Sequence, residues 1–166
     1  MCGVLIINQA IMPKQSAGIL PFRIHHNTLQ VFLVHPGGPF WKNKDAGVWS
    51  IAKGEYEDNE EPIDAAKREF TEETGQTIDG EFTDIGYVKY KNGKVVRAWA
   101  VAADVDEQNI TSNVFKLEWP PKSGKMIDVE EVDRAGWFDV STAKEKIIPA
   151  QAELIANLQK LLDSNR

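Results

Sequence analysis

Cysteine is almost absent from this chain, since Cys2 is the only one among 166 residues. A single thiol cannot form a disulfide within the chain or a cysteine-based zinc site, so neither is expected. Apolar runs are also short. None approaches the length of a membrane-spanning helix, and the apolar run at residues 4–7 lacks the basic start of a signal peptide. We therefore expect a protein of the reducing cytoplasm that makes no contact with a membrane.

Basic residues are not in excess either, because 19 Lys and Arg stand against 25 Asp and Glu, which gives a net charge of -6. This balance argues against binding to nucleic acid. The acidity belongs to one segment: residues 54–75 hold nine acidic and two basic residues, whereas the remainder of the chain is nearly neutral. A local excess of carboxylates suits a divalent-cation site better than a generally acidic surface.

The composition predicts a single folded domain. Hydrophobic residues make up 42% of the chain and charged residues 27%, and the chain is long enough to bury a core. We expect the domain to span residues 13–166. Because Met12 would make a natural start, residues 1–12 are expected to be an N-terminal extension or a short added strand.

Periodic apolar runs predict a mixed sheet covered by helices on both faces, an α/β fold of the α+β type. Strands are expected at residues 17–23, 29–34, 48–51, 82–91, 94–103 and 135–138. Asn92 and Gly93 predict a type I′ hairpin turn, residues 35–47 a loop that contains His35, and residues 106–130 irregular structure. Thr142 and Glu145 match a capping box, and apolar residues at helical spacing over 154–162 predict a final amphipathic helix.

The segment 54–75, GEYEDNEEPIDAAKREFTEETG, predicts a helix with an unfavourable cluster of charge. Pro62 suits the first helical position, and Gly75 the position just past the end. Three glutamates then lie at i, i+3 and i+4 on one face: Glu69, Glu72 and Glu73. Like charges at this spacing repel, and the helix dipole disfavours them in the last turns. The cluster needs a cation, and oxygen ligands without cysteine or histidine indicate Mg²⁺ or Mn²⁺ rather than zinc.

This segment resembles the signature of the Nudix hydrolases, G-x5-E-x7-R-E-U-x-E-E-x-G-U, where U is a bulky apolar residue. Eight positions are in register: Gly54, Glu60, Arg68, Glu69, Phe70, Glu72, Glu73 and Gly75. The last apolar position departs, because it holds Gln76, and we expect the apolar contact to pass to Ile78. Eight matches at fixed spacing are highly specific, and the alternative is a solvated acidic helix. The segments HPGGPFW, SIAKGEYE and EWPP are also similar to a bacterial Nudix subgroup described as nucleoside-triphosphate pyrophosphohydrolases.

The resemblance implies an α/β/α sandwich with a mixed sheet and a Mg²⁺-dependent hydrolase, with Mn²⁺ as a substitute. Such an enzyme cleaves a phosphoanhydride bond, here in a nucleoside triphosphate or a dinucleoside polyphosphate, with metal-activated water. The ligands that it implies are Glu69, Glu72, Glu73 and the main chain of Gly54, with a further carboxylate from Glu131, Glu130 or Glu118. Glu69 matches a frequent general base, and Arg68 is expected to orient a carboxylate. The alternative is a nucleotide-binding or regulatory Nudix module without catalysis, and a homodimer is compatible with either.

Substrate-binding residues are less clear from the sequence. Lys53 lies immediately before the signature, where it could reach a phosphate, although a solvated lysine fits equally well. Trp41 and Tyr90 are aromatic residues that could stack on a nucleobase. Glu118 lies in the stretch FKLEWPPKSGK, which could fold over the substrate. The other tryptophans, Trp49, Trp99 and Trp137, are expected in the core, and His35 is expected to have no chemical task.

Overall fold

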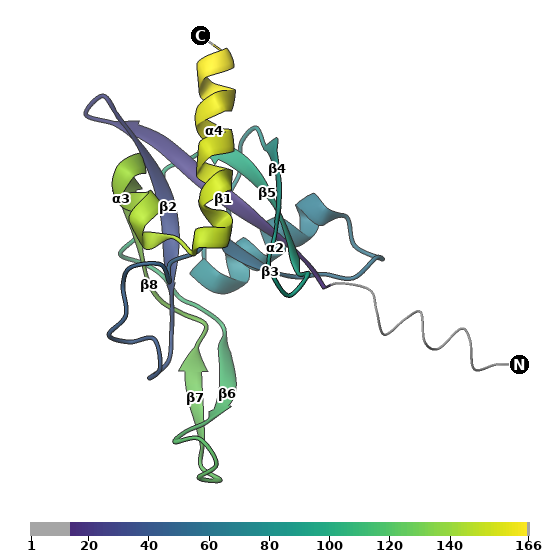
Figure 1. Ribbon diagram of the computed structural model, residues 1–166, viewed down its shortest axis with the longest axis vertical. Helices are drawn as coiled ribbons and strands as arrows, with labels where there is room; N and C mark the ends of the chain where they lie inside the picture. The colour runs from purple at the N-terminus through teal and green to yellow at the C-terminus, as the bar shows by residue number, and fades with distance from the viewer. Residues whose placement is uncertain (1–13, 166) are drawn as a thin grey trace, which may run out of the picture.

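The computed structural model describes residues 14–165, in which a mixed six-stranded sheet lies between helices (Figure 1). Strand β1 (Gln15–His25) pairs in parallel with β5 (Val95–Ala102) on one side. On its other side it pairs antiparallel with β3 (Ala52–Glu55) along its first half and with β2 (Thr28–Pro36) along its second. The strand order is β4-β5-β1-β2-β8, with β4 at Thr83–Lys89 and β8 at Val132–Asp139. The expected extension at residues 1–12 lies outside the described residues.

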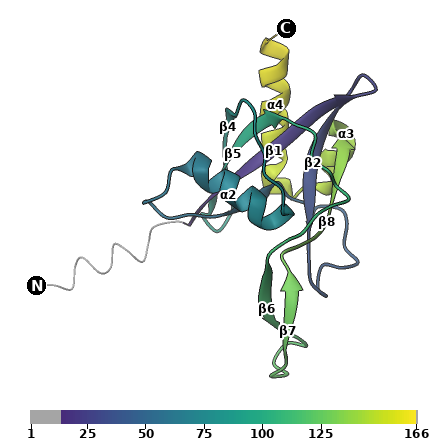
Figure 2. The same cartoon turned by 180° about the vertical axis from the view of Figure 1, so that it is seen from behind.

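Helices cover both faces of this sheet, as the views from opposite sides show (Figures 1 and 2). Alternate strand residues point to opposite faces. Leu20 therefore joins a buried cluster with Leu154 and Leu158 of helix α4 (Ala152–Ser164), whereas its neighbour Ile19 joins a second cluster with Phe70 of helix α2 (Pro62–Thr74). Helix α3 (Val140–Lys146) and the 3-10 turn η1 (Pro149–Gln151) lie on the α4 side. The expected α/β/α sandwich with a mixed sheet is confirmed.

The bounds of α2 agree with the sequence signals. Pro62 begins the helix, and Gly75 ends it with φ of 73°, a left-handed conformation that glycine adopts without strain. Ile78 is buried, and the Gln76 side chain instead donates to the carbonyls of Asp106 and Asn109, so the apolar contact does pass to Ile78. No helix within residues 14–165 is both long and apolar enough to span a membrane.

Two local predictions were wrong. The β4–β5 connection is not a type I′ turn, because such a turn needs a positive φ at both central residues. Gly93 has a φ of 91°, but Asn92 is not among the residues with positive φ. The amide of Gly93 donates to the carbonyl of Tyr90, as in a type I turn followed by a left-handed glycine. The capping box at Thr142 does not form either, since the cap of α3 is Asp139, whose carboxylate accepts from the amide of Thr142 at 2.8 Å.

Residues 106–130 are more regular than expected, because they contain a second, two-stranded sheet. Strands β6 (Val114–Glu118) and β7 (Met126–Glu130) pair antiparallel and project from the body of the molecule as an arm (Figure 1). Their alternation puts apolar side chains on one face of the arm: Phe115, Leu117, Ile127 and Val129. The strand-like alternation was present in the sequence on both sides of the Pro-rich turn.

Candidate active site

The carboxylate of Glu69 lies directly against Gly54. A Cβ atom at residue 54 would stand 2.0 Å from the carboxyl carbon of Glu69, so any side chain there would take the place of the carboxylate. Gly54 is in β3, and Glu69 is in the second half of α2, where it is only 8% exposed. The glycine that begins the sequence signature is therefore needed to make room for a glutamate fifteen residues later.

Arg68 binds three carboxylates and so fixes the acidic face of α2. Its Nε and Nη2 donate to the two oxygens of Glu60, each at 2.9 Å, while Nη1 donates to Glu69 at 2.8 Å and to Glu72 at 3.1 Å. These hydrogen bonds, with Glu60 first, raise the pKa of Arg68 above its already high ordinary value. The guanidinium thus holds Glu69 and Glu72 in fixed positions, in agreement with the orienting role expected from the sequence.

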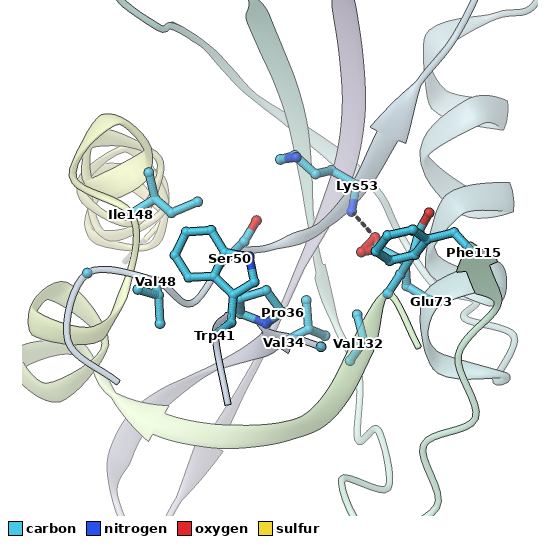
Figure 3. Close-up of a pocket in the computed structure, with 13 residues that line it drawn as sticks. Val34, Pro36, Trp41, Val48, Ser50, Lys53, Glu73, Phe115, Val132 and Ile148 are labelled. Carbon is cyan, nitrogen blue, oxygen red and sulfur yellow. Dashed lines mark hydrogen bonds between the residues drawn. The ribbon is translucent and has the colours of Figure 1, made fainter. Parts of the chain in front are cut away.

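Glu73 is a buried carboxylate that lacks a cationic side chain beside it. It is 7% exposed, and its Oε2 accepts a hydrogen bond from the main-chain amide of Lys53 at 2.9 Å (Figure 3). Burial, with smaller contributions from the negative charges of Glu131 and Glu69, raises the pKa of Glu73 to about 8, against the opposing hydrogen bond and charge of Lys53. Among residues 14–165, no Lys, Arg or His side chain forms an ion pair with Glu73. A buried carboxylate without such a partner is costly when ionised, so the site favours a bound cation.

The remaining members of the expected ligand set have the donor chemistry that Mg²⁺ and Mn²⁺ prefer, since all are oxygen donors. Burial raises the pKa of Glu69, against the opposing hydrogen bond of Arg68, and the charges of Glu72 and Glu131 add to the rise. Glu131 therefore lies close enough to the helix to interact with both buried glutamates. In the part of the chain that the structure describes, no three acidic, histidine or cysteine side chains converge on one point. Glu69 and Glu72 are bound to Arg68. The residues therefore fit a divalent ion by the type of their donor atoms, and binding would require the carboxylates to turn toward it.

A cavity of about 410 Å³ begins at Glu73 and Glu131 and runs between the sheet and the loop after β2 (Figure 3). At its acidic end it is lined by Lys53, Glu73, Glu131 and Phe115, and at its apolar end by Val48 and Ile148. The Trp41 ring lies between the two ends. The Lys53 side chain extends away from the Glu73 carboxylate, so the amide of Lys53, rather than its ammonium, contacts the acidic face.

The loop that carries Trp41 is anchored by His35, which was expected to be a loop residue without a task. Strand β2 extends through Pro36, so His35 is in the strand and fully buried. One ring nitrogen lies 2.8 Å from the carboxylate of Asp133, and the other 2.7 Å from the carbonyl oxygen of Lys44. Both partners are acceptors, to which a ring N–H of His35 can donate. His35 thereby ties the loop to β8.

The other residues expected to bind substrate lie in different places. Glu118 is on the arm, where its carboxylate accepts from the amide of Lys122 at 2.6 Å, and it lines a second cavity beside Trp41. Tyr90 lies on the α4 side of the sheet, and its hydroxyl accepts from the buried Gln151 at 2.8 Å, so it does not line the cavity at the carboxylates. Phe115, which does line it, was not singled out from the sequence. Its alternation with Leu117 in β6 was the available signal.

Comparisons with known proteins give one family. The model of the NUDIX domain family matches residues 12–158 of the chain. A stretch of 101 residues, 61% of this chain, is 31% identical to the octanoyltransferase of Myxococcus xanthus. That match covers 25% of the octanoyltransferase, so the chain spans about a quarter of the length of this relative.

Solved structures share the fold at low sequence identity. The Ap4A hydrolase of C. elegans, in a binary complex, is 18% identical with a TM-score of 0.63, and the match covers 91% of this chain and 98% of that one. The NUDIX domain of NrtR from Shewanella oneidensis, complexed with ADP ribose, is 14% identical with a TM-score of 0.65, over 98% and 99% of the two chains. A mutT/nudix family protein from Listeria innocua is 17% identical with a TM-score of 0.61, over 93% and 97%. At these identities the likeness shows the fold alone.

Proposed function

Since the chain belongs to the NUDIX domain family, we propose that it is a Mg²⁺-dependent hydrolase, with Mn²⁺ as a substitute, that cleaves a phosphoanhydride bond in a nucleoside triphosphate or a dinucleoside polyphosphate. The observation that carries this proposal is the pair of buried carboxylates, Glu69 and Glu73, on one face of α2, with Glu73 lining a cavity. The Ap4A hydrolase and the ADP-ribose complex among the structural neighbours support a nucleotide substrate.

The chemistry of the bond explains why the site is acidic. A diphosphate resists hydrolysis because its negative oxygens repel a nucleophile, and a bound divalent ion neutralises that charge and lowers the pKa of water. Glu69, Glu72, Glu73 and Glu131 would hold the ion, together with the main chain of Gly54. Of the two buried glutamates, Glu73 lines the cavity directly, so a phosphate bound in the cavity would lie against the acidic face of α2.

In this proposal, Glu69 takes a proton from the attacking water, and Arg68 holds Glu69 in position. Oε1 of Glu69 accepts from Arg68, which leaves Oε2 as the atom that takes the proton from the water. Arg68 keeps this carboxylate oriented throughout, because the same guanidinium is bound by both oxygens of Glu60. Arg68 is therefore a positioning residue, whereas Glu69 is the general base of the proposal.

Trp41 and Lys53 would bind the substrate. The indole of Trp41 spans the middle of the cavity, where a nucleobase can stack on it. The polyphosphate would then extend toward Glu73, and the Lys53 ammonium would have to swing toward it to bind a phosphate oxygen. Because Cys2 is the only cysteine of the chain, we propose a reducing cytoplasm as its compartment.

The test is release of phosphate and nucleotide from a panel of substrates, with Mg²⁺ and with chelator. The panel holds common and 8-oxo nucleoside triphosphates, diadenosine tetraphosphate, ADP-ribose and nucleotide sugars. We expect Mg²⁺-dependent turnover that Glu73→Gln reduces at least 100-fold, roughly the loss for one group that acts at a transition state. Glu61→Gln is the matched control, because Glu61 precedes the same helix and its side chain makes no cap hydrogen bond. Near-normal turnover of the folded Glu73→Gln protein would overturn the metal assignment, and nucleotide binding without turnover would favour the non-catalytic module.

A further inference from the structure

A second cavity, of about 510 Å³, lies between the β6–β7 arm and the loop after β2. The proposed hydrolysis at α2 does not require it. Its walls are aromatic on both sides, with Phe40 and Trp41 from the loop and Phe115 and Trp119 from the arm. Phe40 and Trp41 pack edge to face, with ring centroids 4.7 Å apart, so the loop presents an ordered aromatic wall.

Two aromatic side chains in the walls of this cavity are exposed to solvent rather than buried in the core. Phe40 is 52% exposed and Phe115 is 40% exposed, although both lie at the cavity. A two-stranded hairpin is only marginally stable alone, so an arm with an open apolar face gains stability when something fills the space beside it. On the opposite face of the same arm, charged residues such as Lys116 and Asp128 form an ion pair and face solvent.

The cavity is lined by one acidic side chain, Glu118, and one basic side chain, Lys122, and a second basic side chain lies over the Phe40 ring. The ammonium of Lys44 lies 3.6 Å from the centroid of the Phe40 ring and 5.3 Å from that of Trp41, and Lys122 is at the arm side. The carboxylate of Glu118 is already bound to the amide of Lys122. An occupant with a flat π system and attached negative charge suits these walls better than an alkyl chain or a cation, which describes a nucleobase joined to phosphate.

The two cavities adjoin each other. They share Gly37, Trp41 and Phe115, and Phe115 lines the first cavity together with Glu73 (Figure 3). One branch leads from this point under Trp41 to Val48 and Ile148, and the other leads along the arm to Trp119. A polyphosphate held at the carboxylates therefore has an aromatic-walled space on either side of it.

We propose that the arm cavity is a subsite for a second nucleobase, so that the substrate is a dinucleoside polyphosphate rather than a mononucleotide. This inference rests on the proposed function, because it assumes that the polyphosphate lies at the carboxylates of α2. Phe40 and Trp119 determine specificity: they hold the second base and do not take part in bond cleavage.

The test compares two substrates that differ by one nucleoside, diadenosine tetraphosphate and adenosine tetraphosphate. In the wild-type protein, KM for the dinucleoside should be lower by roughly 10-fold or more, which is the effect of stacking one base on aromatic side chains. Trp119→Ala and Phe40→Ala should remove this advantage and leave KM for adenosine tetraphosphate unchanged. Trp119→Phe should retain most of it because a ring remains. Met126→Ala, on the solvent face of the same arm and 58% exposed, is the matched control and should change neither value.

The outcomes separate the subsite from the hydrolase. If wild-type protein cleaves both compounds but Trp119→Ala and Phe40→Ala alter their KM values equally or not at all, the subsite is overturned and the hydrolase stands. If neither compound is cleaved, calorimetry with the same two compounds still tests the subsite, because tighter binding of the dinucleoside must then depend on Trp119 and Phe40. Equal binding of the two compounds would overturn the subsite there too.

Discussion

Substitution of Gly54 by alanine should separate activity from stability. The new Cβ would lie 2.0 Å from the carboxyl carbon of Glu69 and 2.0 and 2.4 Å from its oxygens. Nonbonded carbon atoms keep about 3.5 Å, so the carboxylate must move by about 1.5 Å. A misplacement of about 1 Å can cost about 100-fold in rate, so we expect kcat/KM to fall at least that far.

The fold should tolerate the same substitution. Gly54 is in an ordinary strand conformation, since it is not among the glycines with positive φ, and its amide stays in the β1–β3 ladder. The three atoms nearest to the new methyl group all belong to the end of the Glu69 side chain, which can rotate away. Alanine also loses less backbone entropy than glycine on folding, so the free energy of unfolding should change by less than ~1 kcal/mol.

Steady-state turnover, Mn²⁺ binding by calorimetry and urea denaturation together check this prediction. A Glu69→Ala background is the control, because Gly54→Ala should cause no further loss of metal affinity once the carboxylate is gone. Two results would refute the reasoning. Normal turnover would show that the position of Glu69 is unimportant, and global unfolding would show that the backbone rather than the carboxylate absorbs the methyl group.

Three further predictions concern stability. In metal-free protein, unfolding releases a proton between pH 4.5 and about 8, because burial raises the pKa of Glu73 from 4.5 to about 8. The contribution of Glu73 is therefore most favourable at low pH and is lost as the pH rises through this window; urea titrations should show a slope that Glu73→Gln flattens, and an unchanged slope would contradict the burial argument. His35→Phe should lower the free energy of unfolding by ~1–3 kcal/mol in urea, since the acceptors on Asp133 and Lys44 lose a buried donor, and a loss below ~0.5 kcal/mol would show that they find another. Asp139→Ala should cost ~1 kcal/mol by the same assay whereas Glu145→Ala should cost less than ~0.5 kcal/mol, because Asp139 caps α3; the reverse order would support the capping box.

The acidic helix was predictable because all its signals are local. Pro62 and Gly75 mark its ends by backbone geometry alone, and the spacing of the glutamates fixes which of them share a face. The reason for Gly54 was not available from spacing, since it depends on how β3 approaches the helix. The signature includes a glycine at this position, and the packing of Glu69 against Gly54 explains why a side chain would not fit there.

His35 and Tyr90 show where local reasoning fails. His35 precedes the segment Pro-Gly-Gly-Pro, which favours a loop. The structure has His35 in β2 instead, where it forms a hydrogen bond with Asp133, 98 residues away in the sequence. Tyr90 follows β4, and the sequence of that strand does not show which face of the sheet the Tyr90 side chain takes. The pairing of β4 with β5 places this side chain on the α4 side. In both cases a contact distant in sequence decides the outcome, so no window of neighbouring residues contains the information.

This division between local and distant contacts also separates reaction from substrate. The carboxylates that would hold a metal come mainly from one helix, so a short segment is enough to predict the reaction type. The space around the substrate is built by the loop after β2, the arm and the residues that follow α3. These three segments are distant from one another in the sequence. A change in any one of them would alter the cavity while the acidic helix kept its form. Discrimination among nucleotides should therefore depend on the arm and the loop, and it is there that variants can change the substrate without removing hydrolysis.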